Sequence, residues 1–173
     1  MITLICGTNR PNNQSQKFIN TYKELLNERN VDCEELYLEH LPHDLAFAND
    51  IIGTAAIELK NEIEKKIIPA KKLVVVVPEY NGSLPGILKS FIDCIEPKYF
   101  REKLVALVGV SAGRSGNLRG MDHLTGIFNY LGAEVLATKV DIANLNTILD
   151  KNGAPTNEEV IRRMNLQIDH LLK

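Results

Sequence analysis

Four consecutive valines, Val74 to Val77, form the centre of the apolar run "KLVVVVP" and constrain the fold more than any other stretch. A strand with one face in solvent alternates apolar and polar residues, whereas the middle of this run is apolar at every position. The run therefore predicts a strand that is buried on both faces. Such strands belong to parallel sheets with helices on both sides, so Lys72–Pro78 predicts the central strand of an α/β fold.

Short apolar runs alternate along the chain with longer segments of helical periodicity. The expected strands are Ile2–Cys6, Val31–Leu38, Lys72–Pro78, Lys103–Val110 and Ala133–Val140. The expected helices are Ser15–Asn30, Ala55–Ile68, Leu84–Ile95, Asn117–Leu131 and a last one that begins with Thr156 as its N-cap. This alternation predicts an α/β three-layer sandwich around a five-stranded parallel sheet, built as a single domain over residues 1–173.

Charge and cysteine content limit the classes of function. The chain has 20 basic and 22 acidic residues and a formal charge of -2, which provides no basic surface for nucleic acid. The chain has an odd number of cysteines, Cys6, Cys33 and Cys94, and no two of them form a C-x-x-C pair. We therefore expect reduced thiols and a cytoplasmic location. The sequence shows neither a signal-peptide pattern nor an apolar run long enough to span a bilayer, so no membrane contact is expected.

The loop after the first strand, "GTNRPNNQSQ", carries hydroxyls, amides and Arg10 just before a helix. If the strand order is 2-1-3-4-5, ligands bind between the carboxyl ends of the first and third strands, beside this loop. The free N–H groups and partial positive charge of a helix N-terminus attract phosphate, and Thr8, Arg10 and Ser15 can add hydrogen bonds. The same residues also suit a plain polar turn with Ser15 as the N-cap, so both interpretations stay open.

Two missing motifs narrow the kind of phosphate. The loop contains neither the G-x-x-x-x-G-K-[ST] pattern of nucleoside-triphosphate sites nor the G-x-G-x-x-G pattern of dinucleotide sites. A phosphate monoester held mainly by side chains and amides fits the sequence better.

The loops after the third and fourth strands carry further candidate residues. Pro78–Asp93 places the amphipathic ring of Tyr80 ahead of Asn81 and Gly82, which would let the backbone approach a planar ligand closely. Gly109–Leu124 is rich in small residues that leave backbone N–H groups bare. Each loop also has a plainer interpretation, Tyr80 as a half-buried core aromatic and the later loop as a flexible surface segment.

The string "PEYNGSLPGILKSFID" closely resembles the signature of the NADPH-dependent FMN reductases, a flavodoxin-like family with azoreductase-, chromate-reductase- and quinone-reductase-like members. G-T-x-R after the first strand and S-x-G-x-x-G after the fourth occur in the order of that family. The resemblance extends from Ile2 to about Leu136. It implies a flavodoxin-like sandwich with strand order 2-1-3-4-5 that binds FMN.

The resemblance also implies a role for each matching residue. The FMN phosphate is expected at Thr8, Arg10, Asn12, Gln14 and Ser15. The flavin and its ribityl chain are expected along Pro78, Glu79, Tyr80, Asn81 and Gly82, and the pyrimidine end of the ring at Ser111, Ala112, Gly113 and Gly116. The chain departs from the common pattern twice, with Gln14 as a more distant amide and with Asn117 where many members have a second glycine.

The function that the resemblance implies is hydride transfer from NADPH or NADH to FMN and on to a small acceptor, such as a quinone, an azo compound or free flavin. No catalytic side chain and no metal is expected, and backbone N–H groups from Ser111 to Gly116 would stabilise the reduced ring. A homodimer or homotetramer is implied too, through the helix after the P-E-Y-N segment. The alternatives are a flavodoxin-type electron carrier without NAD(P)H activity, or a member that has lost its flavin.

Overall fold

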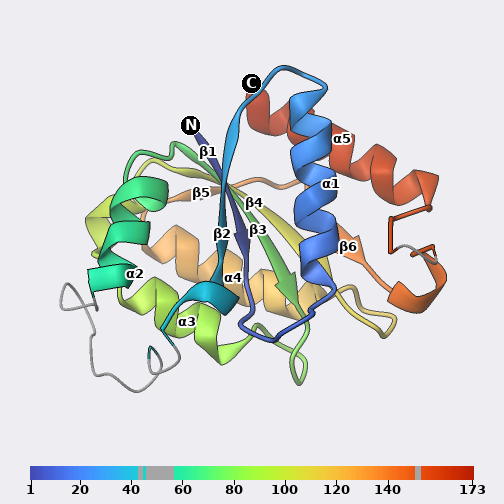
Figure 1. Cartoon of the computed structure of the whole chain (residues 1–173), viewed down its shortest axis with the longest axis horizontal. Helices are drawn as coiled ribbons and strands as arrows, with labels where there is room; N and C mark the ends of the chain where they lie inside the picture. The colour runs from blue at the N-terminus through green and yellow to red at the C-terminus, as the bar shows by residue number, and fades with distance from the viewer. Residues whose placement is uncertain (43–44, 46–56, 151–152) are drawn as a thin grey trace.

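A parallel sheet with helices on both faces forms the centre of the molecule (Figure 1). The computed structural model describes residues 1–42, 45, 57–150 and 153–173. The strands are β1 (Ile2–Cys6), β2 (Cys33–Tyr37), β3 (Lys72–Pro78), β4 (Leu104–Val110), β5 (Glu134–Val135) and β6 (Val140–Ile142). The α-helices are α1 (Ser15–Asn27), α2 (Ile57–Glu62), α3 (Gly86–Asp93), α4 (Leu118–Tyr130) and α5 (Glu158–Leu172). The order β2-β1-β3-β4-β5, with every pair parallel, confirms the expected flavodoxin-like sandwich.

The four valines of β3 divide between the two faces of the sheet. Val74 and Val76 pack in the core beneath α1 and α5, whereas Val75 and Val77 pack in the core beneath α2, α3 and α4. All four side chains are 0% exposed. The prediction of a central strand covered on both faces is therefore confirmed.

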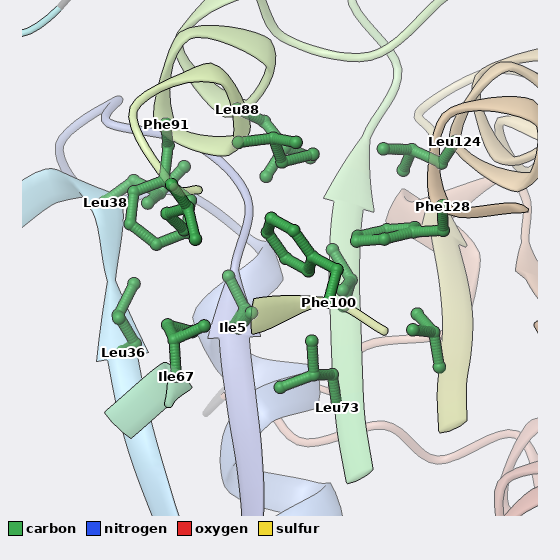
Figure 2. Packing of buried hydrophobic residues seen from close by; sticks show 14 of the residues in the cluster. Ile5, Leu36, Leu38, Ile67, Leu73, Leu88, Phe91, Phe100, Leu124 and Phe128 are labelled. Carbon is green, nitrogen blue, oxygen red and sulfur yellow. The ribbon is translucent and has the colours of Figure 1, made fainter. Parts of the chain in front are cut away.

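Aromatic rings fill the core on the α3 and α4 side of the sheet. Figure 2 shows Ile5 and Leu73 on the sheet, with Phe91, Phe100 and Phe128 packed over them. The rings of Phe100 and Phe128 meet edge to face, with their centroids 5.8 Å apart. This packing anchors α3 and α4 on the strands whose carboxyl ends carry the second and third loops.

The expected fifth strand, Ala133–Val140, is broken into two short strands, so the sheet has six strands instead of five. β5 pairs with the start of β4 and β6 pairs with its end. Between them the side chain of Gln167, on α5, takes the place of a strand: its Nε2 donates to Leu107 O at 3.0 Å and to Thr138 O at 2.6 Å. Its Oε1 accepts from the hydroxyl of Tyr22 on α1. The buried amide thus satisfies the β4 carbonyl that the break leaves without a ladder partner.

The start of the last helix differs from the sequence expectation. The N-cap of α5 is Asn157, whose Oδ1 accepts from Val160 N–H at 3.1 Å, and not Thr156. Thr156 is bonded to the preceding loop instead, because its N–H donates to Ile148 O at 2.8 Å. The expected helix start at Ala55 lies outside the described residues; α2 is described from Ile57, and a π-helical turn, Ile63–Ile67, continues it.

The register of the sheet brings three loops to one edge. Cys6 pairs with Val76, and Pro78 pairs with Val110, so β1, β3 and β4 end close together. Gly7 N–H donates to Val76 O at 2.8 Å, and Glu79 N–H donates to Val110 O at 2.8 Å. The segments expected to form one site therefore begin side by side.

Candidate functional site

A cleft of about 360 Å³ opens at this edge of the sheet, between the three loops. Nine of the fourteen predicted site residues line it: Arg10, Asn12, Gln14, Ser15, Pro78, Glu79, Tyr80, Ser111 and Ala112. The other lining residues, which the expected site set did not include, are Pro11, Asn13, Val110 and Leu145. The tertiary structure thus joins parts of all three loops and adds Leu145 from the segment after β6.

The start of α1 presents unpartnered polar groups to the cleft. Ser15 is the first residue of α1, 1% exposed, and its Oγ has no hydrogen-bond partner among the described residues. The N–H groups of Gln14 and Ser15 likewise have no partner within the described part of the chain. A buried hydroxyl without a partner costs free energy, so this cradle suits an acceptor of several hydrogen bonds, such as an anion.

Ser15 is therefore not the N-cap that the plain-turn interpretation required. Gln14 holds the N-cap position in helical geometry and makes no side-chain cap bond. The capping bond comes from Asn13, whose Oδ1 accepts from Gln16 N–H at 3.2 Å. The Ser15 hydroxyl is thereby left for another partner.

Arg10 provides the cation of the cleft. Its side chain is exposed, and no carboxylate pairs with it among the described residues. Its backbone N–H donates to Thr8 Oγ1 at 3.2 Å, which fixes the loop and leaves the guanidinium unengaged. An unpaired guanidinium beside an N-terminal helix turn adds to the preference for an anion.

Asn13 fixes the shape of the loop and does not offer its amide to a ligand. It is 8% exposed, and its Nδ2 donates to Arg10 O at 2.9 Å. Its Oδ1 also accepts from the thiol of Cys6 at 3.3 Å. An Asn in the loop after a strand is a weak sequence signal, because only the fold brings Cys6 and Arg10 O to the two ends of its amide.

Tyr80 joins the second loop to the first. Its hydroxyl lies 2.7 Å from Thr8 Oγ1, and Thr8 is 0% exposed. Thr8 is therefore engaged inside the protein and does not line the cleft, unlike the expectation for a phosphate ligand. Tyr80 itself lines the cleft and is half-buried.

Asn81 and Gly82 form the tip of a tight hairpin and do not line the cleft. Their φ angles are 51° and 78°, the two positive values that a type I′ turn requires. Tyr80 and Ser83 exchange backbone hydrogen bonds of 3.0 Å across the turn. The pair Asn-Gly thus forms the turn that holds Tyr80 and Glu79 in place.

Two backbone N–H groups of the third loop donate hydrogen bonds within the protein. Ser111 N–H donates to Ile142 O at 2.8 Å, and Gly116 N–H donates to Ser111 Oγ at 3.0 Å. The expectation of bare N–H groups throughout the loop is wrong at these two residues. The other N–H groups of this loop, those of Ala112, Gly113, Arg114 and Ser115, have no partner among the described residues. Gly113 and Gly116 do not line the cleft.

Two polar side chains tie the third loop to β3. The Ser115 hydroxyl donates to the Glu79 carboxylate. Asn117, which is 0% exposed with φ 60°, donates from Nδ2 to Val77 O at 3.1 Å. Asn117, which stands where the common pattern has a second glycine, thus adopts a left-handed conformation and fastens the loop to the central strand.

Replacement of Gly109 by alanine is expected to destabilise the protein by about 1–3 kcal/mol, because the third loop would have to move. A Cβ there would lie 2.1 Å from Gly116 O and 2.9 Å from Met121 Cε. The free energy of unfolding, measured with urea, tests this. Gly113→Ala is the matched control, since its Cβ would meet nothing within 4 Å. Equal losses in both variants would contradict the close approach of Gly109 to Gly116.

The titratable groups near the cleft give no sign of a nucleophile or a metal site. Burial raises the pKa of the Cys6 thiol to about 12, so this residue is protonated at neutral pH. No group of three His, Cys, Asp or Glu side chains among the described residues could hold a metal ion. None of the helices in the described part of the chain is long and apolar enough to cross a membrane.

Residues 1–146 match the sequence profile of the family described as NADPH-dependent FMN reductase. The chain belongs to this family. The resemblance carried by the P-E-Y-N string is thereby confirmed. The matched range covers the three loops and Leu145, whereas α5 and its Gln167 lie beyond it.

Two curated relatives have the sequence similarity expected of distant members of the FMN reductase family. A 2-hydroxy-1,4-benzoquinone reductase of Burkholderia sp is 27% identical over 117 residues, which are 65% of this chain and 64% of that protein. An NAD(P)H-dependent FMN reductase of Pseudomonas aeruginosa is 30% identical over 111 residues, or 62% of this chain and 60% of that protein. The chain thus matches slightly less than two thirds of the length of these relatives.

A solved structure agrees with the fold of this FMN reductase family member. It is the flavoenzyme FerB, an NAD(P)H:(acceptor) oxidoreductase of Paracoccus denitrificans, with a TM-score of 0.78 at 20% identity. The superposition covers 99% of this chain and 94% of that one. At this identity the likeness shows the fold alone.

Proposed function

We propose that this chain is an FMN-dependent NAD(P)H oxidoreductase that reduces a small acceptor such as a quinone, an azo compound or free flavin. Its family and the names of its relatives support this activity. The observation that carries the proposal is the start of α1. There the buried Ser15 hydroxyl and the Arg10 guanidinium, both without a partner among the described residues, face one cleft.

The residues present fit the phosphate group of FMN. Ser15 Oγ and the N–H groups of Gln14 and Ser15 supply donors, and Arg10 supplies the positive charge. Asn12 and Gln14 line the same part of the cleft and are exposed, so their amides can reach a bound anion. We assign the phosphate to Arg10, Asn12, Gln14 and Ser15, with Thr8 as a residue that positions the loop.

The second and third loops fit a flat ring. Pro78, Glu79 and Tyr80 line the cleft, and Ser111 and Ala112 line it from the end of the neighbouring strand β4. The N–H groups of Ala112 to Ser115 have no partner in the described part of the chain, so they can donate to the electron-rich edge of the ring and stabilise negative charge there. We assign Asn81, Gly82, Gly113 and Gly116 to holding these loops in place.

When bound, FMN supplies the redox chemistry, since it accepts hydride from NADPH or NADH and passes electrons to the acceptor. The protein then needs no side chain as a catalytic acid, base or nucleophile. Its residues bind the phosphate, orient the ring and leave one face of the cleft open for the two substrates in turn. This arrangement implies ping-pong turnover.

An absorbance experiment tests the proposal. Protein purified with added FMN should retain a flavin spectrum, lose it when NADPH or NADH is added without oxygen, and regain it with benzoquinone or an azo dye. A flavin that stays bound but is not reduced would favour the electron carrier. No bound flavin, together with no rise in melting temperature on addition of FMN, would contradict the proposal.

We also propose that the protein is a homodimer or homotetramer, with the groove between α3 and α4 as its interface. This groove, of about 630 Å³, is lined mainly by apolar residues, among them Ile92, Ile127 and Leu131. Tyr130 stands at its rim with 90% of its surface exposed. A large aromatic side chain so exposed beside an apolar groove is typical of an interface.

Tyr130→Glu is expected to shift the oligomer to monomers, because a charge would be buried at the interface. Light scattering coupled to gel filtration measures the mass. Leu166→Glu is the matched control: Leu166 is 41% exposed on α5, away from the groove, and this variant should keep the wild-type mass. A monomeric wild type would contradict the interface.

The remaining assignments concern the whole chain. We propose that residues 1–173 act as one domain, which the packing of both helical layers on the same sheet supports. We propose a cytoplasmic location, which the three cysteines support, since none of them forms a disulfide. The partners are small molecules: the formal charge of -2 gives no reason to expect nucleic acid, and no membrane contact is proposed.

A further inference from the structure

Glu39 places a carboxylate directly behind the loop that leads into α1. It lies in the short 3-10 turn Leu38–His40, which follows β2, and β2 is the neighbour of β1 in the sheet. Figure 1 shows the end of β2 beside the connection from β1 to α1. The structure thus brings an acidic residue to the edge where the loop residues favour an anion.

One oxygen of Glu39 accepts two hydrogen bonds from this region. Gln16 Nε2, in the first turn of α1, donates to Glu39 Oε2 at 3.0 Å. Asn13 Nδ2 donates to the same oxygen at 3.4 Å and to Arg10 O at 2.9 Å. Glu39 therefore contacts α1 directly and the Arg10 loop through one buried amide.

The charge of Glu39 is not neutralised by a cation. No Lys or Arg pairs with it in the part of the chain that the structure describes, and both of its partners are neutral amides. The carboxylate is half-buried, so water screens it less than an exposed charge. It thus acts as a negative charge at the positive end of α1, in competition with an anion in the cleft.

We propose that Glu39 is a positioning residue that holds the phosphate loop through Asn13 and Gln16 while its negative charge lowers the affinity for FMN. This inference rests on the proposed function, because the anion in question is the phosphate of FMN. Its physical basis is the repulsion between the Glu39 carboxylate and the FMN phosphate, which weakens with distance and with rising salt concentration. The carboxylate would so keep FMN exchangeable, as suits a protein that can also take free flavin as an acceptor.

The charge and the hydrogen bonds of Glu39 can be separated by substitution. Both bonds end on one oxygen, so the amide oxygen of Glu39→Gln can accept them both while the charge disappears. Glu39→Leu removes the charge and the acceptor together. Glu34→Gln is the matched control for charge, because Glu34 is exposed and lies near the start of β2, whereas the Glu39 turn follows the end of that strand.

FMN and riboflavin affinities, measured by quenching of flavin fluorescence, test the proposal. Glu39→Gln should bind FMN about three- to tenfold more tightly than the wild type at low salt, and by a smaller factor at high salt. Its affinity for riboflavin, which lacks the phosphate, should not change, and Glu34→Gln should behave as the wild type. Glu39→Leu should bind FMN more weakly than Glu39→Gln, by about fivefold, because the loop loses its acceptor.

Other results would overturn the proposal. Unchanged or weaker FMN binding by Glu39→Gln, or an equal gain for riboflavin, would refute the role of the charge. Equal FMN affinity of Glu39→Gln and Glu39→Leu would refute the role in holding the loop. A wild type that binds no FMN would instead refute the proposed function, and this inference with it. Melting temperatures of all variants without flavin identify any variant that fails to fold.

Discussion

Arg10→Ala is expected to weaken FMN binding by about 10- to 100-fold, the effect of losing hydrogen bonds to a charged group. The guanidinium is exposed and unpaired among the described residues, so the wild-type fold does not depend on it. The melting temperature without FMN should therefore stay within about 1–2 °C of the wild type. Titration of flavin fluorescence measures the affinity.

Riboflavin, which lacks the phosphate of FMN, is the control ligand for this prediction. Riboflavin affinity should be nearly the same in Arg10→Ala and the wild type, because the side chain is assigned to the phosphate alone. Arg10→Lys should retain part of the FMN affinity, since it keeps the charge and loses the two-pronged geometry. If FMN and riboflavin weaken together, Arg10 shapes the loop instead of binding phosphate.

Gln167→Leu is expected to lower the free energy of unfolding by about 3–5 kcal/mol, a large part of the stability of a small domain. Leucine removes the partner of two buried groups, the carbonyl of Leu107 and the hydroxyl of Tyr22, and of the partly buried carbonyl of Thr138. Each unsatisfied group costs about 1–3 kcal/mol, and gain of an apolar side chain offsets part of the sum. Urea unfolding followed by circular dichroism measures the loss.

Two further variants separate the network from a general effect on α5. Asn165→Leu replaces an amide whose one side-chain bond in the described chain is to Ile161 O, at 3.0 Å within the same helix, and should cost less than about 0.5 kcal/mol. Tyr22→Phe removes one member of the network and should cost about 1 kcal/mol. A Gln167→Leu variant as stable as Asn165→Leu would show that water satisfies the exposed carbonyls.

The sequence predicted most of the fold because the signals are local and repeated. The valine run of β3 identified a strand covered on both faces, and the alternation of elements indicated the sandwich. It did not predict the break between β5 and β6, because no local pattern in Ala133–Val140 encodes it. The break depends on Gln167, about thirty residues later, whose buried amide replaces the missing strand contacts.

For the candidate site, the sequence identified the three loops and most of the residues that line the cleft. It could not tell lining residues from supporting ones, because that depends on where each side chain finds its partner. Thr8, which was expected at the phosphate, is buried and hydrogen-bonded to Tyr80. The sequence left two roles open for Ser15, an N-cap or an anion ligand. In the structure the capping bond is made by Asn13 and not by Ser15.

By itself, then, the sequence determined the class of fold, the family and the edge of the sheet where a ligand would bind, since periodicity and motif order are properties of the chain. The tertiary structure decided which polar groups are satisfied and which are left over. It brought Glu39, Asn13 and Arg10 together from two neighbouring strand ends. It also left the buried Ser15 hydroxyl without a partner among the residues that the structure describes. Hydrogen-bond satisfaction depends on contacts between distant segments, and for that reason no local pattern could predict it.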